Sequence, residues 1–401
     1  MKTRRVISLL LVLGILFSFT ACTQGEGAEA PTEADQSEET NGDAVEAPTE
    51  ADQSEEANDD AAEPIRIGYL HLGYTGSLMI EANRLIDYAG EALGVEVVYG
   101  GSFSDAESVI RNAENLVAAG VDGLIVCNFT EQSLVSIAKT CEENGVYFAQ
   151  YYRTLTNPEV ITELEGNEYY VGRTFESEYD VAYNLGMQLV NAGSKNVALL
   201  SYNHGDTTAE TRYKGYTDVF NENGVAIVAE EWDVEDAAVS ATNLLAAYPE
   251  IDGWALITSY YAPGVKVALE NAGKGKMPIV GVDFYDSMGQ DMEDGYLLAI
   301  GGGHHASPLF SFLMVYNAIN GAYDPTGFPF DVQDNILVLK NYEDYQNYMK
   351  WYVGDVLPFT AEEIKALTIT YNPEHTISDL QEAAAALTLE DVMSRHESLI
   401  N

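Results

Sequence analysis

The chain has 401 residues, of which 64 are acidic and 19 are lysine or arginine, so its formal charge is −45 at pH 7. Hydrophobic residues make up 46% of it, too many for a disordered chain and too few for a bundle of membrane helices. A charge this negative repels phosphate backbones and excludes nucleic-acid binding through a basic groove. Residues 65–401 alone carry a charge of −33, and their length predicts two domains.

The first 22 residues predict export. Basic residues in the first five positions precede the apolar run Val6–Phe19, which has the length of a signal-peptide core and is short for a membrane span. The run leads into Thr20-Ala21-Cys22, which resembles the lipobox of bacterial lipoproteins, with Phe19 where that motif usually has leucine. The resemblance implies that residues 1–21 are a signal peptide and that Cys22 carries a lipid. The alternative is an ordinary secretory signal with an incidental cysteine.

Residues 22–64 predict a disordered, acidic tether. The segment Glu29–Thr40 recurs almost unchanged as Glu46–Ala57, and residues 23–63 contain 15 acidic side chains and no basic one. Such a sequence cannot bury enough apolar surface to offset the entropy of ordering it. We expect this segment to hold a folded region away from a membrane surface.

From Ile65 onward, short apolar runs alternate with segments of helical periodicity. A first series predicts strands at 65–70, 95–99, 123–127 and 146–150, with helices at 77–93, 105–119 and 131–144. A second series predicts strands at 169–171, 196–201, 226–230, 253–258 and 278–282, with helices at 176–192, 208–223, 236–247 and 263–272. The alternation predicts an α/β protein with two doubly wound parallel sheets in tandem.

The last hundred residues depart from this rhythm. An apolar strand at 297–301 and a helix at 307–319 are expected to return to the first domain. A strand at 335–339, an aromatic stretch at 342–352 and helices at 361–367 and 380–387 follow. Nothing in these residues predicts a role for the last fifty.

The cysteines and the known motifs give no sign of a catalytic, metal or cofactor site. Cys127 and Cys141 are expected to be two buried free thiols rather than a disulfide. Phosphate-binding loops, dinucleotide fingerprints, nucleophile elbows and zinc-protease motifs are missing from the sequence. His304-His305 has no ligand partners at zinc spacing, and the acidic residues between 286 and 294 do not match a calcium loop, so we expect a solvated helix face there.

Aromatic and polar residues recur just past the carboxyl ends of the predicted strands. They are Tyr74, Phe129, Tyr151, Tyr152, Arg153, Tyr202, Tyr260, Tyr261, Asp283, Phe284 and Tyr285. Ligands of open α/β sheets bind outside those strand ends. Aromatic faces can stack on a flat or CH-faced ligand, and charged groups can fix its hydroxyls. The pattern therefore predicts one cleft for a small polar ligand.

Residues 65–345 resemble the type I periplasmic binding proteins, in the ribose- and galactose-binding class that serves ABC transporters. The segments that carry the resemblance are 65–70 (IRIGYL), 118–126 (AAGVDGLIV), 211–216 (TRYKGY), 249–254 (PEIDGW) and 277–283 (MPIVGVD). The resemblance implies two lobes, joined by three crossovers, that close on a ligand. We expect the first lobe at 65–165 with 300–325, the second at 166–299 with 326–345, and a helical extension at 346–401.

The resemblance also implies ligand-binding residues. The ligand aspartate falls on Asp283, and the arginine after the fourth strand on Arg153, beside Tyr152. The other expected positions are Thr258 and Ser259, Glu210 with Arg212 nearby, His304, and either Tyr74 or His71. The Thr-Ser pair and Glu210 depart from the residues usual in sugar binders.

The resulting hypothesis is a monomeric, lipid-anchored receptor outside the cytoplasm, without a cofactor. It would bind a small ligand, with a carbohydrate favoured, and present it to a membrane ABC permease. Alternatives are a sensory receptor of the same fold, a nucleoside binder and, least favoured, an extracellular enzyme.

Overall fold

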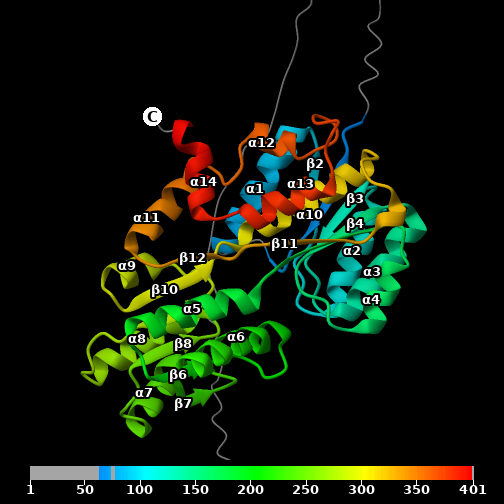
Figure 1. The fold of residues 1–401 in the computed structure, drawn as a ribbon. Coiled ribbons are helices and arrows are strands. Elements are labelled where there is room, and N and C mark those ends of the chain that lie inside the picture. The colour runs from blue at the N-terminus through cyan, green and yellow to red at the C-terminus, as the bar shows by residue number, and fades with distance from the viewer. Residues whose placement is uncertain (1–62, 74–76, 400–401) are drawn as a thin grey trace, which may run out of the picture. The chain divides into compact units, whose positions relative to one another are not determined.

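The computed structural model describes residues 63–73 and 77–399, and residues 61–401 form one compact unit. The predicted signal peptide, Cys22, the repeat-containing tether and Tyr74 lie outside the described residues. Two six-stranded sheets lie in separate lobes (Figure 1). The predicted α/β fold with two doubly wound sheets is confirmed.

The first sheet has the order β11-β5-β4-β3-β1-β2 with all neighbouring strands parallel. Its strands are β1 (Arg66–Leu70), β2 (Glu96–Tyr99), β3 (Gly123–Val126), β4 (Tyr147–Tyr152), β5 (Tyr170–Glu176) and β11 (Phe330–Asp334). The helices that connect the first five strands are α1 (Ser77–Leu93), α2 (Ala106–Ala118), α3 (Glu131–Asn144) and α4 (Pro158–Glu165).

The second sheet has the order β12-β10-β9-β8-β6-β7, in which only β12 runs antiparallel to its neighbour. Its strands are β6 (Asn196–Leu200), β7 (Ala226–Glu231), β8 (Gly253–Leu256), β9 (Ile279–Val282), β10 (Leu297–Gly302) and β12 (Leu337–Leu339). Its helices are α5 (Glu178–Ala192), α6 (Thr207–Asn223), α7 (Ala237–Ala247), α8 (Ala262–Asn271) and α9 (Met288–Glu293).

Alternation along β6 shows why helices cover both faces of this sheet. Val197 and Leu199 pack in the cluster that contains α5 and α6 residues, whereas Ala198 and Leu200 pack with residues of α7 and α8. Successive side chains of a strand point to opposite faces, so a strand that is apolar throughout needs an apolar layer on each side. Because these strands are apolar along their whole length, the sheet is covered by helices on both of its faces.

Local signals set the helix ends. Asp105 and Thr130 each form a capping box with the serine three residues later, at the starts of α2 and α3. Gly94, Gly120 and Gly145 follow α1, α2 and α3 with φ between 69° and 77°, a conformation that glycine adopts without a steric penalty. The predicted ends of these helices are confirmed to within one residue at most.

Three strands lie in a different sheet from the one predicted. The strand expected at 169–171 in the second lobe is β5, which extends to Glu176 and pairs with β4 in the first sheet. Residues 330–334 were assigned to the second lobe, but they form β11 on the edge of the first sheet, while β10, expected to return to the first domain, lies in the second sheet. The sequence of a strand does not show which of the two sheets the strand joins. Strands of both sheets are buried on both faces and therefore have the same continuous apolar pattern.

The chain crosses between the lobes at three places. They are the step from β5 to α5 at residues 176–178, the step from β10 to α10 at residues 303–306, and the step from β11 to β12 at residues 335–336. The three-crossover arrangement is thus present, and it places Glu176 and His304 on two adjoining connections.

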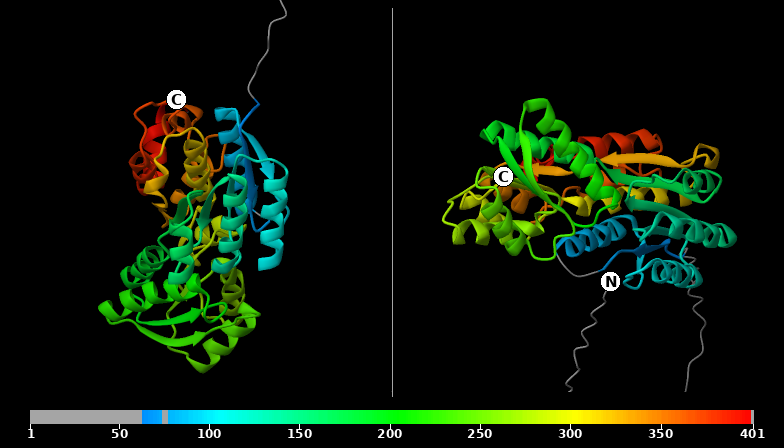
Figure 2. Two further views of the ribbon diagram at one scale, coloured as in Figure 1. Left: turned by 90° about the vertical axis from the view of Figure 1, so that its right-hand side faces the viewer. Right: turned by 90° about the horizontal axis from the view of Figure 1, so that it is seen from below.

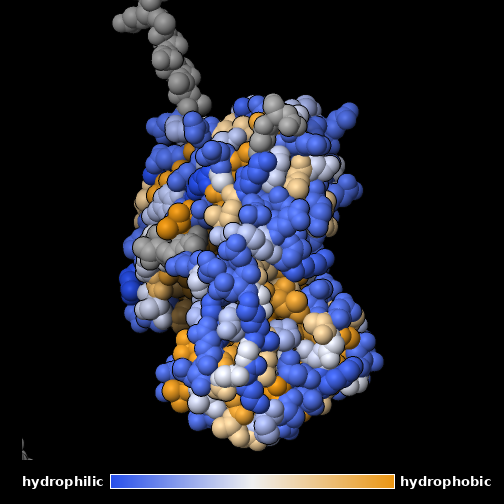
Figure 3. Space-filling model, turned by 90° about the vertical axis from the view of Figure 1, so that its left-hand side faces the viewer, coloured by the Kyte–Doolittle hydropathy of each residue, from blue (hydrophilic) through white to orange (hydrophobic). Residues whose placement is uncertain are grey.

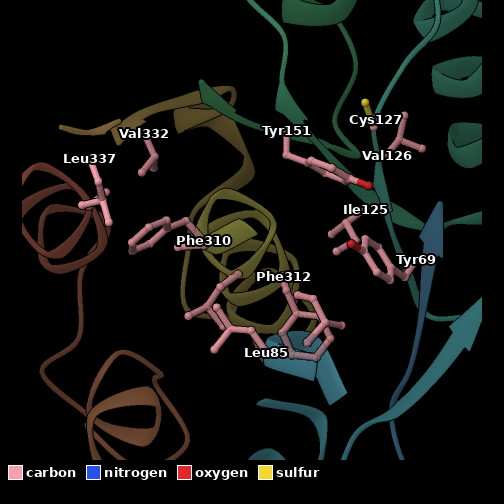
Figure 4. Packing of buried hydrophobic residues seen from close by; sticks show 14 of the residues in the cluster. Tyr69, Leu85, Ile125, Val126, Cys127, Tyr151, Phe310, Phe312, Val332 and Leu337 are labelled. Atoms are coloured by element: carbon pink, nitrogen blue, oxygen red, sulfur yellow. The ribbon is translucent and has the colours of Figure 1, made fainter. Parts of the chain in front are cut away.

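Helix α10 (Ser307–Ile319) is the core of the first lobe. Every residue of it except Ile319 is buried, and it packs against β3, β4 and β5. In Figure 4, Phe310 points toward Val332 and Leu337, and Phe312 lies on the other side of the helix near Leu85. A helix that is apolar on all sides must be enclosed, and here the C-terminal region completes the enclosure. No helix in the described part of the chain is both long and apolar enough to cross a membrane.

The C-terminal region contains α11 (Tyr342–Trp351), α12 (Ala361–Ala366), α13 (Ile377–Ala386) and α14 (Leu389–His396), so the predicted helical extension is present. It contacts both lobes: α11 packs on α9 and β12 of the second, whereas α12 packs on α1 and α13 on β11 and α10 of the first. Figures 1 and 2 show α12 and α13, in orange and red, beside α1 and α10. Arg395 of α14 donates hydrogen bonds to Glu363 of α12, 2.5 Å away, and to the Pro358 carbonyl.

The two described cysteines are free and buried, as predicted. Burial raises the pKa of Cys127 to about 11 and that of Cys141 to about 12. Both are therefore neutral thiols at physiological pH, and they pack as small apolar side chains.

Gly172 provides a test of the β5–β11 pairing. Its φ is +148°, and a Cβ there would lie 2.1 Å from the backbone oxygen of Phe330. We expect Gly172→Ala to destabilise the protein by about 2 kcal/mol or more in urea unfolding, because the strands would have to separate. Gly166→Ala is the control, since its nearest contact would be 3.6 Å. Equal stability of the two variants would contradict the pairing.

Candidate functional site

A chain of buried ion pairs connects the lobes where the carboxyl ends of their strands meet. Asp283 follows β9, His304 follows β10, and Glu176 ends β5 in the other sheet. The His304 Nδ1 atom lies 2.7 Å from Glu176 Oε2, and its Nε2 atom lies 3.3 Å from Asp283 Oδ1. A single imidazole therefore joins a carboxylate of the first lobe to a carboxylate of the second.

Arg212 of α6 continues this chain within the second lobe. Its guanidinium lies 3.1 Å from Asp283 and 2.5 Å from Glu178, and it also donates to the Ile257 carbonyl at 2.9 Å. Its side chain is only 4% exposed, so these hydrogen bonds replace its hydration. A planar, five-donor group suits such a buried set of acceptors.

Burial and charge act in opposite directions on the protonation of these groups. Burial alone would raise the pKa of Asp283, but Arg212 and His304 hold that pKa well below its usual value. Burial alone would lower the pKa of His304, but Glu176 and Asp283 raise that pKa well above the usual value. His304 is therefore a cation at neutral pH, and Asp283 an anion.

Several residues predicted from the sequence meet here. The structure brings together Asp283, Arg212 and His304, and Thr258 lies buried beside Asp283. Ser259 is fully buried next to them and lines neither of the cavities described below.

His71 and Tyr152 lie next to this group on the side of the first lobe. The ring of Tyr152 is 5.8 Å from that of His71 and 6.5 Å from that of His304. Tyr152 has a φ of 69°, unusual for a bulky residue, at the point where β4 ends. Arg153, one residue on, faces an open groove.

Glu210 does not join the group. It lies exposed on the first turn of α6, accepts a hydrogen bond from the Gly205 backbone N–H and lies 3.5 Å from His204. Glu210 was predicted as a ligand-binding residue only from its place in the family motif. Arg212, two residues later, is the residue of this helix that is buried beside Asp283.

Glu176 and Glu178 were not predicted as site residues. The sequence placed a helix start at residue 176, so both appeared to be first-turn carboxylates. Recognising the end of β5 at Glu176 would have put them at a strand end, where the other site residues were found.

Two hollows border the ion pairs. A small cavity of about 220 Å³ is lined by residues of both lobes, of the second crossing and of the C-terminal region: Leu78, Glu81, Tyr260, Asp283, Phe284, Tyr285, Asp286, Met288, Gly303, His304, His305, Tyr345, Tyr348, Met349 and Val353. An open groove of about 500 Å³ is lined by Arg153, Tyr152, Glu176, Glu178 and other polar residues. Figure 3 shows the face that carries α9 and α11, with a hollow bordered by hydrophobic residues.

The acidic residues near the small cavity are only partly a solvated helix face. Asp286 and Glu293 are exposed, but Asp291 is buried, with Lys266 at 2.6 Å and the Tyr285 hydroxyl at 2.9 Å. No group of three or more His, Cys, Asp or Glu residues in the described ranges is arranged to hold a metal ion.

Comparison with known proteins gives consistent results. The sequence profile of the family described as "Periplasmic binding protein domain" matches residues 69–304. The D-ribose/D-allose-binding protein of Pseudomonas aeruginosa is 22% identical over 200 residues, which is 49% of this chain and 62% of that protein. The xylitol-binding protein of Mycolicibacterium smegmatis is 22% identical over 213 residues, 52% of this chain and 58% of that protein. The chain thus matches less than two thirds of the length of these relatives.

A solved structure agrees in fold. The periplasmic solute-binding protein of an ABC transporter from Actinobacillus succinogenes, solved with bound D-allose, superposes with a TM-score of 0.63 at 20% identity. The superposition covers all of that chain and 71% of this one. The remainder of this chain has no counterpart in that structure.

The cross-lobe ion pair can be tested by Glu176→Gln. The variant leaves His304 without its first-lobe carboxylate, and we expect a loss of about 3 kcal/mol of stability near pH 6. Because the pKa of His304 is raised in the folded state, this contribution is fully present below pH about 6.5 and is lost as the pH rises through the folded pKa. The measurement is urea unfolding of both proteins from pH 6 to 9.

Glu210→Gln makes the same chemical change in the exposed pair with His204 and should cost under about 1 kcal/mol. A similar small loss for Glu176→Gln would show that the buried pair contributes no more than a surface one.

Proposed function

Because the chain belongs to the periplasmic binding protein domain family, we propose that it is the solute-binding protein of an ABC importer and takes a small carbohydrate into the cleft between its lobes. The predicted family resemblance is confirmed, and this is a family of binding proteins rather than enzymes. The sugar and polyol named for the relatives support a carbohydrate as the ligand class.

The observation that carries the proposal is the cavity lined from both lobes at the cross-lobe ion pair. Glu81 contributes from α1 of the first lobe, Asp283 from the second, and His304 from a crossing between them. A ligand that contacts both lobes binds the closed arrangement better than the open one, and only such differential binding shifts the population toward closure. Closure is then the signal that a membrane permease reads.

We further propose that the protein works outside the cytoplasm, anchored through Cys22. The lipobox-like residues before Cys22 and the acidic segment after it support a lipid anchor with a spacer. In this proposal the two lobes follow the two sheets, with α10 in the first, and the partner is a permease in the same membrane.

A ligand screen tests the binding proposal. In thermal unfolding with D-ribose, D-allose, xylitol, other sugars, nucleosides and amino acids, a ligand at one hundred times its Kd should add about 2.7 kcal/mol. For a chain of this size that raises the melting temperature by about 2–4 °C per kcal/mol. We expect a sugar or polyol to give the largest rise. A rise with nucleosides alone would keep the receptor role and overturn the carbohydrate assignment.

The same assay tests the assigned residues. We expect Asp283→Ala to lose at least tenfold in affinity for the ligand identified, because it removes a charge-assisted hydrogen bond in the small cavity, and a similar loss in Arg153→Ala would extend the binding site into the open groove. Glu250→Gln, which changes an exposed carboxylate away from both hollows, is the control. Full affinity in both alanine variants would contradict the site.

Replacing Cys22 tests the anchor. We expect Cys22→Ser to abolish incorporation of labelled fatty acid and to move the protein from the membrane fraction to the soluble exported fraction, since the thioether cannot form without the sulfur. Unchanged membrane association of the variant would argue for an ordinary secretory signal or for another mode of attachment.

A further inference from the structure

One wall of the small cavity comes from α11, outside the residues that match the family. Tyr345, Tyr348 and Met349 line the cavity, whereas the family match ends at residue 304. Contacts with the second lobe fix this wall: the Tyr348 ring meets Phe284 edge-on at 4.8 Å, and a Cβ on Gly289 would lie 2.3 Å from the Tyr345 ring. Arg84 of α1 ties the end of the wall to the first lobe, 2.8 Å from the Val353 carbonyl.

The cavity wall combines aromatic rings with carboxylates, of which two are already paired. Five aromatic residues line the cavity, together with the carboxylates of Glu81, Asp283 and Asp286. The cation His304 also lines it and pairs with Asp283, and Glu81 pairs with Arg84 at 3.2 Å. No described residue forms an ion pair with Asp286, which is exposed at the cavity.

His305 adds a buried acceptor to this wall. Its side chain is 3% exposed, its ring lies 4.9 Å from that of Tyr352, and its Nε2 atom has no hydrogen-bond partner among the described residues. Burial lowers its pKa to about 3, so the ring is neutral at physiological pH. A neutral imidazole that donates through one nitrogen presents a lone pair on the other. The wall of the cavity therefore contains a buried imidazole nitrogen that no described residue satisfies.

The adjoining ion pairs are short of positive charge. Three carboxyl groups, those of Glu176, Glu178 and Asp283, share the two cations Arg212 and His304. Glu176 Oε1 is buried without a hydrogen-bond partner among the described residues. An incompletely compensated set of buried carboxylates is costly, and a positive group placed beside it lowers that cost.

We propose that the ligand carries a protonated amine, as an amino sugar does, and that this amine binds in the small cavity between the carboxylates of Asp283 and Asp286 and the aromatic rings around them. Aromatic faces attract cations, and a charged N–H donor forms the stronger kind of hydrogen bond with a carboxylate. This inference rests on the proposed function and narrows its ligand class, and it assigns α11 a part in specificity.

Isothermal titration of the full purified protein at pH 6.5 tests it with matched ligands. D-Glucosamine and D-galactosamine carry the charge, their N-acetyl forms and the parent sugars do not, and choline carries it without a sugar. We expect at least one amino sugar to bind tenfold or more tighter than its neutral counterparts, with affinity falling as salt rises.

Each other outcome is decisive. Neutral sugars that bind as well as amino sugars would overturn the inference and leave the proposed function in place. Choline binding without sugar binding would keep the cationic ligand and overturn the carbohydrate assignment. Binding of none of these ligands, together with a rise in melting temperature for a neutral sugar or polyol in the wider screen, would overturn the inference and leave the proposed function in place.

Variants separate charge from shape. Asp286→Asn should weaken the amino sugar at least tenfold and the neutral sugar less than twofold, while Glu250→Gln should change neither. Met349 is 44% exposed at the cavity, so polar replacements should be accommodated there. Met349→Lys should weaken amino-sugar binding far more than Met349→Gln, and equal effects of these two would contradict an electrostatic role for this wall.

Discussion

The two lobes depend on one histidine held between two carboxylates. His304 sits on the second crossing, and its two ring nitrogens face Glu176 of the first lobe and Asp283 of the second. A buried charge that is paired on both sides fixes the distance between its partners, because separating either leaves an uncompensated charge. The small cavity and the open groove both border the residues of this contact.

The pairing also occupies the charged groups of the site with one another. The acidic and basic groups around Asp283 are engaged with one another, and their shifted pKa values stabilise charges rather than move protons. Perturbed protonation often marks a catalytic centre. Here the perturbed groups form the ion pairs between the two lobes, and the cavity beside them is lined by aromatic rings and hydrogen-bond acceptors.

The sequence was sufficient to predict the alternating strands and helices, but not to predict which sheet each strand joins. The helices 77–93, 131–144 and 307–319 were predicted to the residue because their apolar patterns are clear, and Gly94 and Gly145 mark the ends of the first two. The sheet membership of β5 and β11 was wrong, since pairing is decided by partners distant in sequence. Asp283 and His304 followed from the family motif, whereas the contribution of α11 to the cavity could not, because an aromatic helix gives no sign of which surface it meets.

The position of β11 on the edge of the first sheet has a consequence for how the molecule forms during synthesis. Arg173 of β5 pairs with Asp331 of β11, 158 residues later, and the whole second lobe except β12 lies between them in sequence. The first lobe therefore cannot be completed until almost all of the second has been made, so an N-terminal fragment of the growing chain holds an unfinished sheet edge. Contacts this distant slow folding, and unpaired edges invite association. During synthesis, the edge of the first sheet therefore stays unpaired until β11 has been made, and in that time it can associate with other copies of the chain.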